Sequence, residues 1–162
     1  MSGIQAPDKE TMEACRLYVD NLIKPIHSLG KLEDIAVRLA GITGKIKPGK
    51  LNKAIIIMAG DTAVDGENKT GGKTSLTEVQ MVSRGLGTVS AVARTLGAPV
   101  YLIDVGLEQN TNDIEGVLTN KVVYGTHRGN PALDQDAVSA AISIGMSVAR
   151  TLAVQGIQAG GI

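Results

Sequence analysis

Two uninterrupted apolar runs constrain the fold of this chain more than any other feature of its sequence. The runs are KAIIIMAGD, residues 53–61, and VYLIDVG, residues 100–106, and each has the length of a β-strand. Continuous apolar runs of this length are typical of parallel strands that are covered on both faces of their sheet. Because segments with helical periodicity alternate with these runs, the sequence predicts an α/β fold with a mostly parallel sheet.

Further elements follow along the chain at spacings that suit this fold. Apolar residues at helical spacing continue from the Ser75–Glu78 capping-box signature to the stop signal at Gly97, so one helix is predicted there, with Gly85 and Gly87 inside it. The other predicted elements are a strand over 120–125, a long helix capped by Asp134 that runs to about 155, and a strand over 156–162.

Two helical segments precede the first apolar run. Asp8 is the predicted cap of the first, which ends ahead of Pro25 because a residue before proline avoids the helical region. Ser28 is the predicted cap of the second, and Gly41 its predicted end. We predict three parts, which are a small helical segment over 1–44, a linker over 45–52 and a partial, apparently truncated α/β domain over 53–162.

The amino-acid composition argues against several classes of function for this chain. Lys and Arg together number 16, as do Asp and Glu, so the net charge is zero and a dominant nucleic-acid or anionic-membrane surface is not expected. Cys15 is the single cysteine, which excludes an intrachain disulfide and a cysteine-rich zinc site. The polar amino terminus has no signal-peptide pattern, and the apolar runs are too short to span a bilayer. We therefore predict a cytoplasmic protein with no nucleic-acid and no membrane partner.

The glycine-rich stretch GENKTGGKTS, residues 66–75, invites comparison with a phosphate-binding P-loop. The P-loop pattern G-x-x-x-x-G-K-[ST] would end at Gly72-Lys73-Thr74 and requires glycine at position 67, which is Glu67 here. About a dozen residues also separate the stretch from the preceding strand, whereas a P-loop leaves its strand directly. We interpret it as a loop above the carboxyl end of that strand, where ligands bind in open α/β sheets.

Two aspartates lie at this ligand-binding edge. Asp61 ends the first apolar run and Asp104 lies near the end of the second. Either carboxylate can contact a substrate or cap a loop, and the sequence leaves both readings open. Loop residues offer weaker candidates, and for each of them a solvated side chain is the simpler reading. His127 and Arg128 can meet a carboxylate or phosphate, and Lys69 and Lys73 can contact phosphate. His27 can serve as a proton donor.

Several stretches resemble the nicotinate-nucleotide:dimethylbenzimidazole phosphoribosyltransferases. That family's opening segment reads K-P-x-G-S-L-G-x-L-E, and residues 24–33 here read KPIHSLGKLE. The runs that end in AGD and in DVG are similar to the ends of its first two strands. The segment GTHRGNPALDQDAVSAAISIGMSVA, residues 125–149, resembles the approach to its long helix. The resemblance covers nearly the whole chain, in order.

The resemblance implies a Rossmann-like large domain, a small helical domain and a dimer with sites near the subunit boundary. It also implies a reaction without metal or cofactor. A base nitrogen or a phenol oxygen attacks the anomeric carbon of nicotinate mononucleotide, nicotinate leaves, and the product serves as the lower ligand of cobamides. No catalytic residue is assigned in this chain. The substrate-binding residues that the resemblance suggests are Ser28, Gly30, Asp61, Thr62, Asp104, His127 and Arg128.

The sequence departs from the family at identifiable places. Thr62-Ala63 stands where the family has His-Gly, and the glycine after K-P-x is replaced by His27 or Ile26. The family's G-E-M-G-I-G-N-T-T motif, which handles ribose and phosphate, and its catalytic carboxylate are expected downstream of QGIQAGGI. Two hypotheses remain: a portion or subunit of the enzyme, as a homodimer or heterodimer, and a non-catalytic structural or regulatory partner of an active paralogue.

Overall fold

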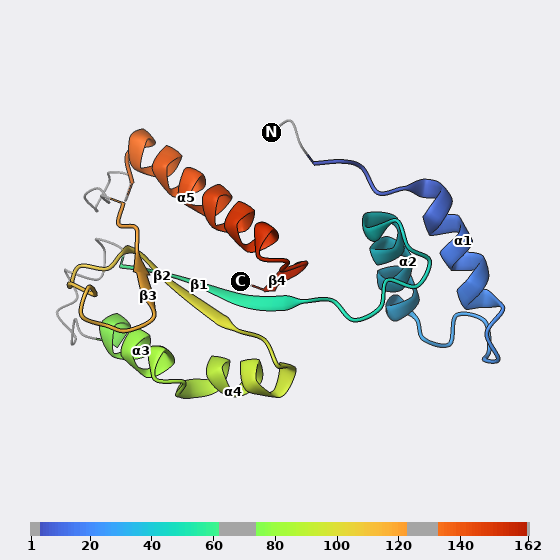
Figure 1. The fold of residues 1–162 in the computed structure, drawn as a ribbon, viewed down its shortest axis with the longest axis horizontal. Coiled ribbons are helices and arrows are strands. Elements are labelled where there is room, and N and C mark those ends of the chain that lie inside the picture. Colours follow the sequence, from blue (N-terminus) through green and yellow to red (C-terminus); the bar gives the residue numbers. More distant parts are fainter. Residues whose placement is uncertain (1–3, 62–73, 123–132, 162) are drawn as a thin grey trace. The chain divides into compact units, whose positions relative to one another are not determined.

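The computed structural model describes residues 4–61, 74–122 and 133–161, and these form two compact units. The first unit spans Met1–Leu51 and is helical, and the second spans Asn52–Ile162 and contains the sheet. Figure 1 shows the helical pair α1 and α2 in the first unit, and the strands with α3, α4 and α5 in the second. The predicted α/β fold class is confirmed.

The first unit is a pair of helices, α1 (Lys9–Asp20) and α2 (Lys31–Thr43). Asp8 caps α1 as predicted, because its carboxylate accepts hydrogen bonds from the backbone N–H groups of Glu10 and Thr11. Buried side chains from both helices form one small core, which Met12 joins from the side. The core residues are Cys15, Val19, Val37 and Ala40.

The predicted bounds of α2 were wrong at both ends. The helix begins at Lys31 after Gly30, whose positive φ of 54° turns the chain, and Ser28 makes no cap. Gly41 lies inside the helix, where a Cβ atom would come within 2.5 Å of the Cγ atom of Met12. Gly41 is therefore a point of close contact between helices, and Gly44, with a left-handed φ of 65°, ends α2.

The second unit holds a parallel sheet with the strand order β3-β2-β1-β4. The two apolar runs form the neighbouring central strands, and Ile56 of β1 pairs with Tyr101 of β2. The third strand lies three residues earlier than predicted, although the N–H groups of Asn120 and Val122 still donate to carbonyl groups of β2. Positions 123–125 of that prediction lie outside the described residues. The strands are β1 (Lys53–Gly60), β2 (Val100–Gly106), β3 (Val117–Thr119) and β4 (Ala159–Gly161).

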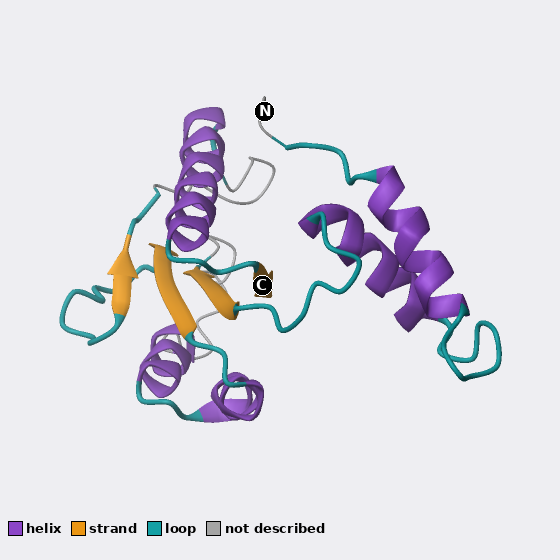
Figure 2. Cartoon of the chain, turned by 45° about the vertical axis from the view of Figure 1, so that its right-hand side comes forward, coloured by secondary structure: helices purple, strands orange, loops and turns teal. Residues whose placement is uncertain are grey.

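Helices cover both faces of this sheet, as the continuous apolar runs predicted. Figures 1 and 2 show α5 (Gln135–Val154) on one face, and α3 (Thr74–Ser83) and α4 (Gly87–Leu96) on the other. Leu152 of α5 packs with Ile56 and Ile103. On the opposite face, Val79 of α3 packs with Leu102 and Leu107. The sheet thus lies between two apolar cores, one on each of its faces.

The single helix predicted between Ser75 and Gly97 is two helices. Gly85 has a φ of 72° and Gly87 a φ of 87°, and these left-handed residues separate α3 from α4. The carbonyl of Gly85 accepts a hydrogen bond from Arg94, which secures the turn. Because α3 begins at Thr74, Ser75 lies within its first turn instead of at the predicted cap.

Helix α5 agrees with the prediction and has an unusually apolar surface. Asp134 caps it, and the Asp134 carboxylate accepts a hydrogen bond from the N–H of Ala137 at 2.7 Å. Among the described residues it is the one helix long and apolar enough to cross a bilayer, by length and composition alone. Leu152 and Val148 pack against the sheet, and most of the other side chains of α5 are exposed or only partly buried. Exposed apolar side chains of α5 are Val138, Ile142, Met146 and Val154.

Candidate functional site

Asp61 and Asp104 lie together at the carboxyl edge of the two central strands, as the sequence predicted. The backbone N–H of Asp61 donates to the carbonyl oxygen of Gly106 at 3.1 Å, which ties the end of β1 to the end of β2. Asp104 pairs with Ala59, and the strand register shifts at the next residue. In an open parallel sheet this edge is the usual position of a ligand site.

Asp104 is completely buried and organises the loop that follows β2. Its Oδ1 atom accepts hydrogen bonds from the N–H groups of Gly106 at 3.0 Å and Leu107 at 2.8 Å. Its Oδ2 atom accepts a hydrogen bond from the buried hydroxyl of Thr111 and lies 3.4 Å from Nζ of Lys121. Both carboxylate oxygens are thus engaged within the protein. The geometry favours the loop-capping role over direct substrate contact.

The surroundings of Asp104 keep its carboxylate ionised. Burial acts to raise the pKa of Asp104, but the hydrogen bond from Thr111 and those from the backbone N–H groups of Leu107 and Gly106 act in the opposite direction. The charge of Lys121 adds to them, and the net result is a lowered pKa for Asp104. The charged form is therefore part of the folded structure.

Lys121, which follows β3, completes this network. Its ammonium group donates to the carbonyl oxygen of Leu107 at 2.8 Å and to that of Gln109, in addition to its ion pair with Asp104. These hydrogen bonds tie the first residues of the loop between β2 and β3 to the chain that follows β3. Sequence analysis named neither Thr111 nor Lys121 as a site residue. Thr111 lies in an irregular segment with no periodic pattern, and Lys121 falls in the strand predicted over 120–125.

Asp61 differs from Asp104 in being only partly buried. One of its oxygens, Oδ2, accepts a hydrogen bond from the N–H of Glu108 at 2.9 Å, which fixes the carboxylate beside the ordered loop. Because Asp61 retains solvent access at the ligand-binding edge, it is the better of the two aspartates for contact with a substrate. The next residue, Thr62, lies outside the described residues, as do His127, Arg128 and the stretch 66–73.

Ser28 and Gly30 lie in the helical unit, in the loop that joins α1 to α2. Ser28 is exposed, and its N–H donates to the carbonyl oxygen of Pro25 at 3.1 Å. The N–H of Gly30 donates to the carbonyl oxygen of His27 at 3.0 Å. Successive turns therefore shape this loop, with Ser28 at its surface.

Glu33 holds this loop in place and was not among the predicted site residues. It is 7% exposed, and its Oε1 atom accepts hydrogen bonds from Nζ of Lys24 at 2.8 Å and from the N–H of Leu29 at 3.2 Å. The Nδ1 atom of His27 lies 3.4 Å from Oε2 of Glu33. The opposite charges of Lys24 and Glu33, at the two ends of KPIHSLGKLE, were the sequence signal that could have predicted this contact.

These contacts also perturb the ionisation of Glu33. The hydrogen bond from Lys24 is the main cause that lowers the pKa of Glu33, and burial opposes it. The N–H of Leu29 and the imidazole of His27 lower that pKa further. Glu33 is therefore ionised in the folded helical unit.

His27 has an unusual backbone conformation that clarifies the alignment of this loop. Its φ is 61°, and among the described residues it is the one non-glycine residue with a positive φ. Glycine adopts this conformation at little cost, whereas a residue with a Cβ atom is strained there. The strained position supports the register in which His27 takes the place of the glycine in K-P-x-G.

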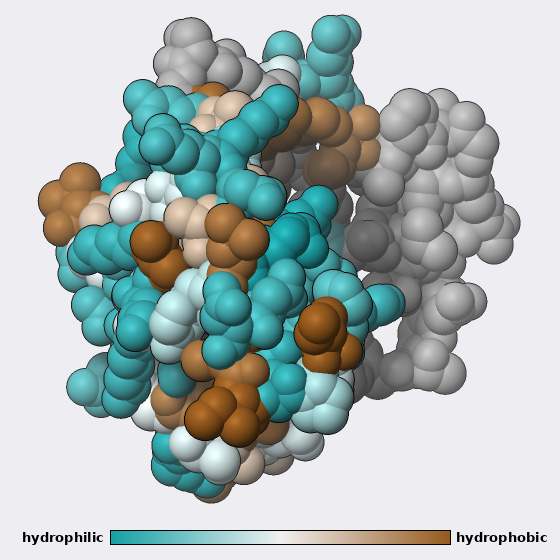
Figure 3. All heavy atoms as spheres, turned by 90° about the vertical axis from the view of Figure 1, so that its right-hand side faces the viewer, coloured by the Kyte–Doolittle hydropathy of each residue, from teal (hydrophilic) through white to brown (hydrophobic). Residues whose placement is uncertain are grey.

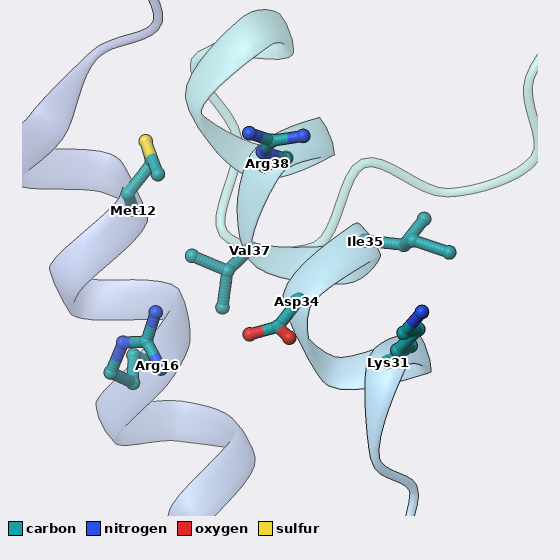
Figure 4. A pocket seen from close by; sticks show the side chains of 7 residues that line it. All are labelled: Met12, Arg16, Lys31, Asp34, Ile35, Val37 and Arg38. Atoms are coloured by element: carbon teal, nitrogen blue, oxygen red, sulfur yellow. The ribbon is translucent and has the colours of Figure 1, made fainter.

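A pocket of about 460 Å³ lies between α1 and α2 in the helical unit. Figure 4 shows Asp34 and Val37 of α2 pointing toward α1, where Met12 and Arg16 lie. The pocket contains none of the predicted site residues. Its lining residues are Met12, Arg16, Lys31, Asp34, Ile35, Val37 and Arg38.

Comparisons with known proteins agree on one family. The family model described as Phosphoribosyltransferase matches residues 4–162. The chain is 41% identical over 150 residues to the nicotinate-nucleotide–dimethylbenzimidazole phosphoribosyltransferase of Alkaliphilus metalliredigens, and the match covers 90% of this chain and 43% of that protein. It is 33% identical over 162 residues to the enzyme of the same name from Geobacter sulfurreducens, with coverages of 97% and 46%.

A solved structure extends the agreement to three dimensions. The nicotinate-nucleotide–dimethylbenzimidazole phosphoribosyltransferase of Thermus thermophilus superimposes with a TM-score of 0.85 at 30% identity, over 96% of this chain and 49% of that one. The chain thus spans about half the length of the relatives it matches. From the order of its motifs, its fold and these matches, the chain belongs to the phosphoribosyltransferase family that includes the nicotinate-nucleotide–dimethylbenzimidazole enzymes.

Proposed function

We propose that this chain supplies the amino-terminal portion, or a separate subunit, of a phosphoribosyltransferase that moves phosphoribose from nicotinate mononucleotide to an aromatic base or a phenol. The product would serve as the lower ligand of cobamides, in cobalamin biosynthesis. One observation supports the proposal most strongly. The family model matches residues 4–162, and within that range Asp61 lies at the end of β1, hydrogen-bonded to the end of β2. The names of the relatives support the identity of the substrates.

The proposed chemistry needs two kinds of negatively charged group. The glycosidic bond from the anomeric carbon to nicotinate breaks while the bond to the acceptor forms, so positive charge develops on the sugar and the acceptor loses a proton. A fixed carboxylate stabilises the first change, and a general base accepts the proton in the second. We assign Asp61 to the wall of the acceptor pocket and Asp104 to the support of that wall. We assign the general base and the phosphate-binding site to the half of the longer relatives that this chain does not span.

The remaining candidates complete the proposed substrate contacts. His127 and Arg128 suit a phosphate or carboxylate by charge, and Thr62 follows Asp61 directly. Ser28 and Gly30 offer a hydroxyl and an exposed backbone in the α1–α2 loop. We also propose a cytoplasmic location and a dimer, either of like chains or with a paralogue. The proposed domains are the helical segment over 1–44, the linker over 45–52 and the α/β domain over 53–162.

A non-catalytic role is the second candidate. Thr62-Ala63 replaces the His-Gly of the resembling motif. A structural or regulatory partner of an active paralogue would retain the fold while losing the chemistry at this edge. Reconstitution distinguishes the two candidates.

The test joins this chain to the half that it does not span. The chain is incubated with nicotinate mononucleotide and dimethylbenzimidazole or p-cresol, alone and with the separately produced carboxyl-terminal half of the Alkaliphilus relative, and nicotinate release is measured. The amino-terminal half of that relative is the positive control. Release with the added half supports the catalytic proposal. Release in the positive control without release from this chain supports the non-catalytic role.

A further inference from the structure

Three potential metal ligands meet where α1 gives way to α2. Asp20 is the last residue of α1, His27 lies in the connecting loop, and Glu33 is in the first turn of α2. One donor atom from each of the three residues lies within 4.8 Å of the others. All three residues of the cluster belong to the helical unit.

Glu33 is held in an orientation that suits a ligand. Lys24 and the N–H of Leu29 both bind its Oε1 atom, which leaves Oε2 directed toward His27. The distance of 3.4 Å from Oε2 to Nδ1 of His27 is close to the separation of two ligands on one tetrahedral ion with bonds of about 2.1 Å. Ligating carboxylates in metal sites are commonly fixed by such outer hydrogen bonds.

His27 adds a ligand at a position where the backbone favours glycine. Its left-handed φ of 61° would suit glycine better than histidine. Packing does not explain the histidine either, because 70% of its side-chain surface is exposed. The imidazole instead directs its Nδ1 atom to the carboxylate of Glu33. A metal ion would give this strained histidine a function that neither the backbone nor the core explains.

We propose that Asp20, His27 and Glu33 bind one first-row divalent transition ion, such as zinc, with water in the remaining coordination positions. One imidazole nitrogen and two carboxylate oxygens are suitable donors for such an ion, and hard ions such as magnesium prefer oxygen alone. The ammonium of Lys24 weakens the binding of any cation nearby, so the site is weaker than a four-ligand structural zinc site. Its role is to fasten the α1–α2 loop.

Metal titrations of the full 162-residue chain test this proposal. Zinc binding is followed by calorimetry, and cobalt binding by its visible absorption spectrum. We expect one ion per chain, and an affinity at least about tenfold lower in Asp20→Asn and in His27→Gly. The chain has one other histidine, so His127→Gln is the matched control and should bind as the wild type does.

The glycine variant keeps the result interpretable, because glycine accepts the backbone conformation at position 27. Zinc should raise the unfolding temperature of the wild type and of His127→Gln, and at the same zinc concentration should raise that of His27→Gly by less. Equal affinity in His27→Gly and wild type would overturn the proposal. The absence of saturable one-to-one binding by the wild type would overturn it as well.

Discussion

At the scale of single residues, this chain uses buried carboxylates to fix its loops. Glu33 accepts hydrogen bonds from residues of the α1–α2 loop, and Asp104 accepts them from the loop after β2. In both cases the carboxylate accepts backbone N–H groups and faces a lysine. Groups that bind the charged form in this way lower the pKa, so both loops depend on ionised side chains.

The Glu33 anchor makes stability depend on pH in a defined direction. Its pKa is lowered in the folded state, so its contribution is complete above the pKa of the unfolded chain and is lost as pH falls through the folded value. Glu33→Gln should therefore lower the unfolding temperature near neutral pH and should approach the wild type in acid. Thermal unfolding across this range checks the expectation, with the exposed Glu13→Gln as control. A difference that stays constant down to the lowest pH would contradict it.

The Asp104 network should behave as one unit. In Asp104→Asn the amide NH₂ must face donors that the carboxylate accepted, and we expect a loss of about 3 kcal/mol in the free energy of unfolding. Thr111→Val should cost about 1.5 kcal/mol, because the buried Oδ2 atom of Asp104 loses its hydrogen-bond donor and keeps only the ion pair with Lys121. The double variant should lose less than the sum of the two. Urea unfolding measures all three, and strict additivity would show that the two side chains act independently.

At the scale of elements, regular periodicity was readable and backbone turns were not. Apolar runs identified β1 and β2, and Asp134 identified the start of α5. The break between α3 and α4 was missed because apolar residues keep their helical spacing across it. Thr111 and Lys121 were missed because only the folded structure brings their side chains to Asp104. The sequence thus located the candidate edge and left the role of Asp104 open.

Gly85→Ala distinguishes one continuous helix from the two observed. In a continuous helix alanine would stabilise the protein by about 1 kcal/mol relative to glycine. At the observed φ of 72° a Cβ atom is strained, and we expect a loss of about 1–2 kcal/mol in the free energy of unfolding. Crowding is not the cause, since the nearest atom to that Cβ lies at an ordinary 3.6 Å. Chemical denaturation decides the sign, and stabilisation by alanine would rule out the turn.

Helix α5 should respond differently on its two faces. Leu152 is 5% exposed against the sheet, so Leu152→Ala should cost about 2–5 kcal/mol in the free energy of unfolding. Ile142 is 59% exposed, and Ile142→Ala should change it by less than about 0.5 kcal/mol. Urea unfolding of the two variants provides the comparison. Equal losses would show that Ile142 packs in the isolated chain as tightly as Leu152 does.

At the scale of the whole molecule, many large apolar side chains of the described residues are exposed. The apolar face of α5 is open, and β4 lies at one edge of the sheet with only β1 beside it. In the view of Figure 3, apolar side chains lie among hydrophilic ones on the molecular surface. Relatives that are about twice as long provide further polypeptide that can cover such surfaces. These open surfaces support the proposal that this chain supplies part of a larger active site.

The most direct test of this account is the rate of nicotinate release by the reconstituted pair when Asp61 is changed to asparagine. Asparagine retains a carbonyl oxygen that can accept the N–H of Glu108, so the edge keeps its shape while one charge is removed. We expect kcat/KM to fall at least about tenfold, which corresponds to about 1.4 kcal/mol of lost transition-state stabilisation, while the exposed Asp113→Asn leaves it unchanged. An unaltered rate in Asp61→Asn would contradict the assignment of this edge to the substrate.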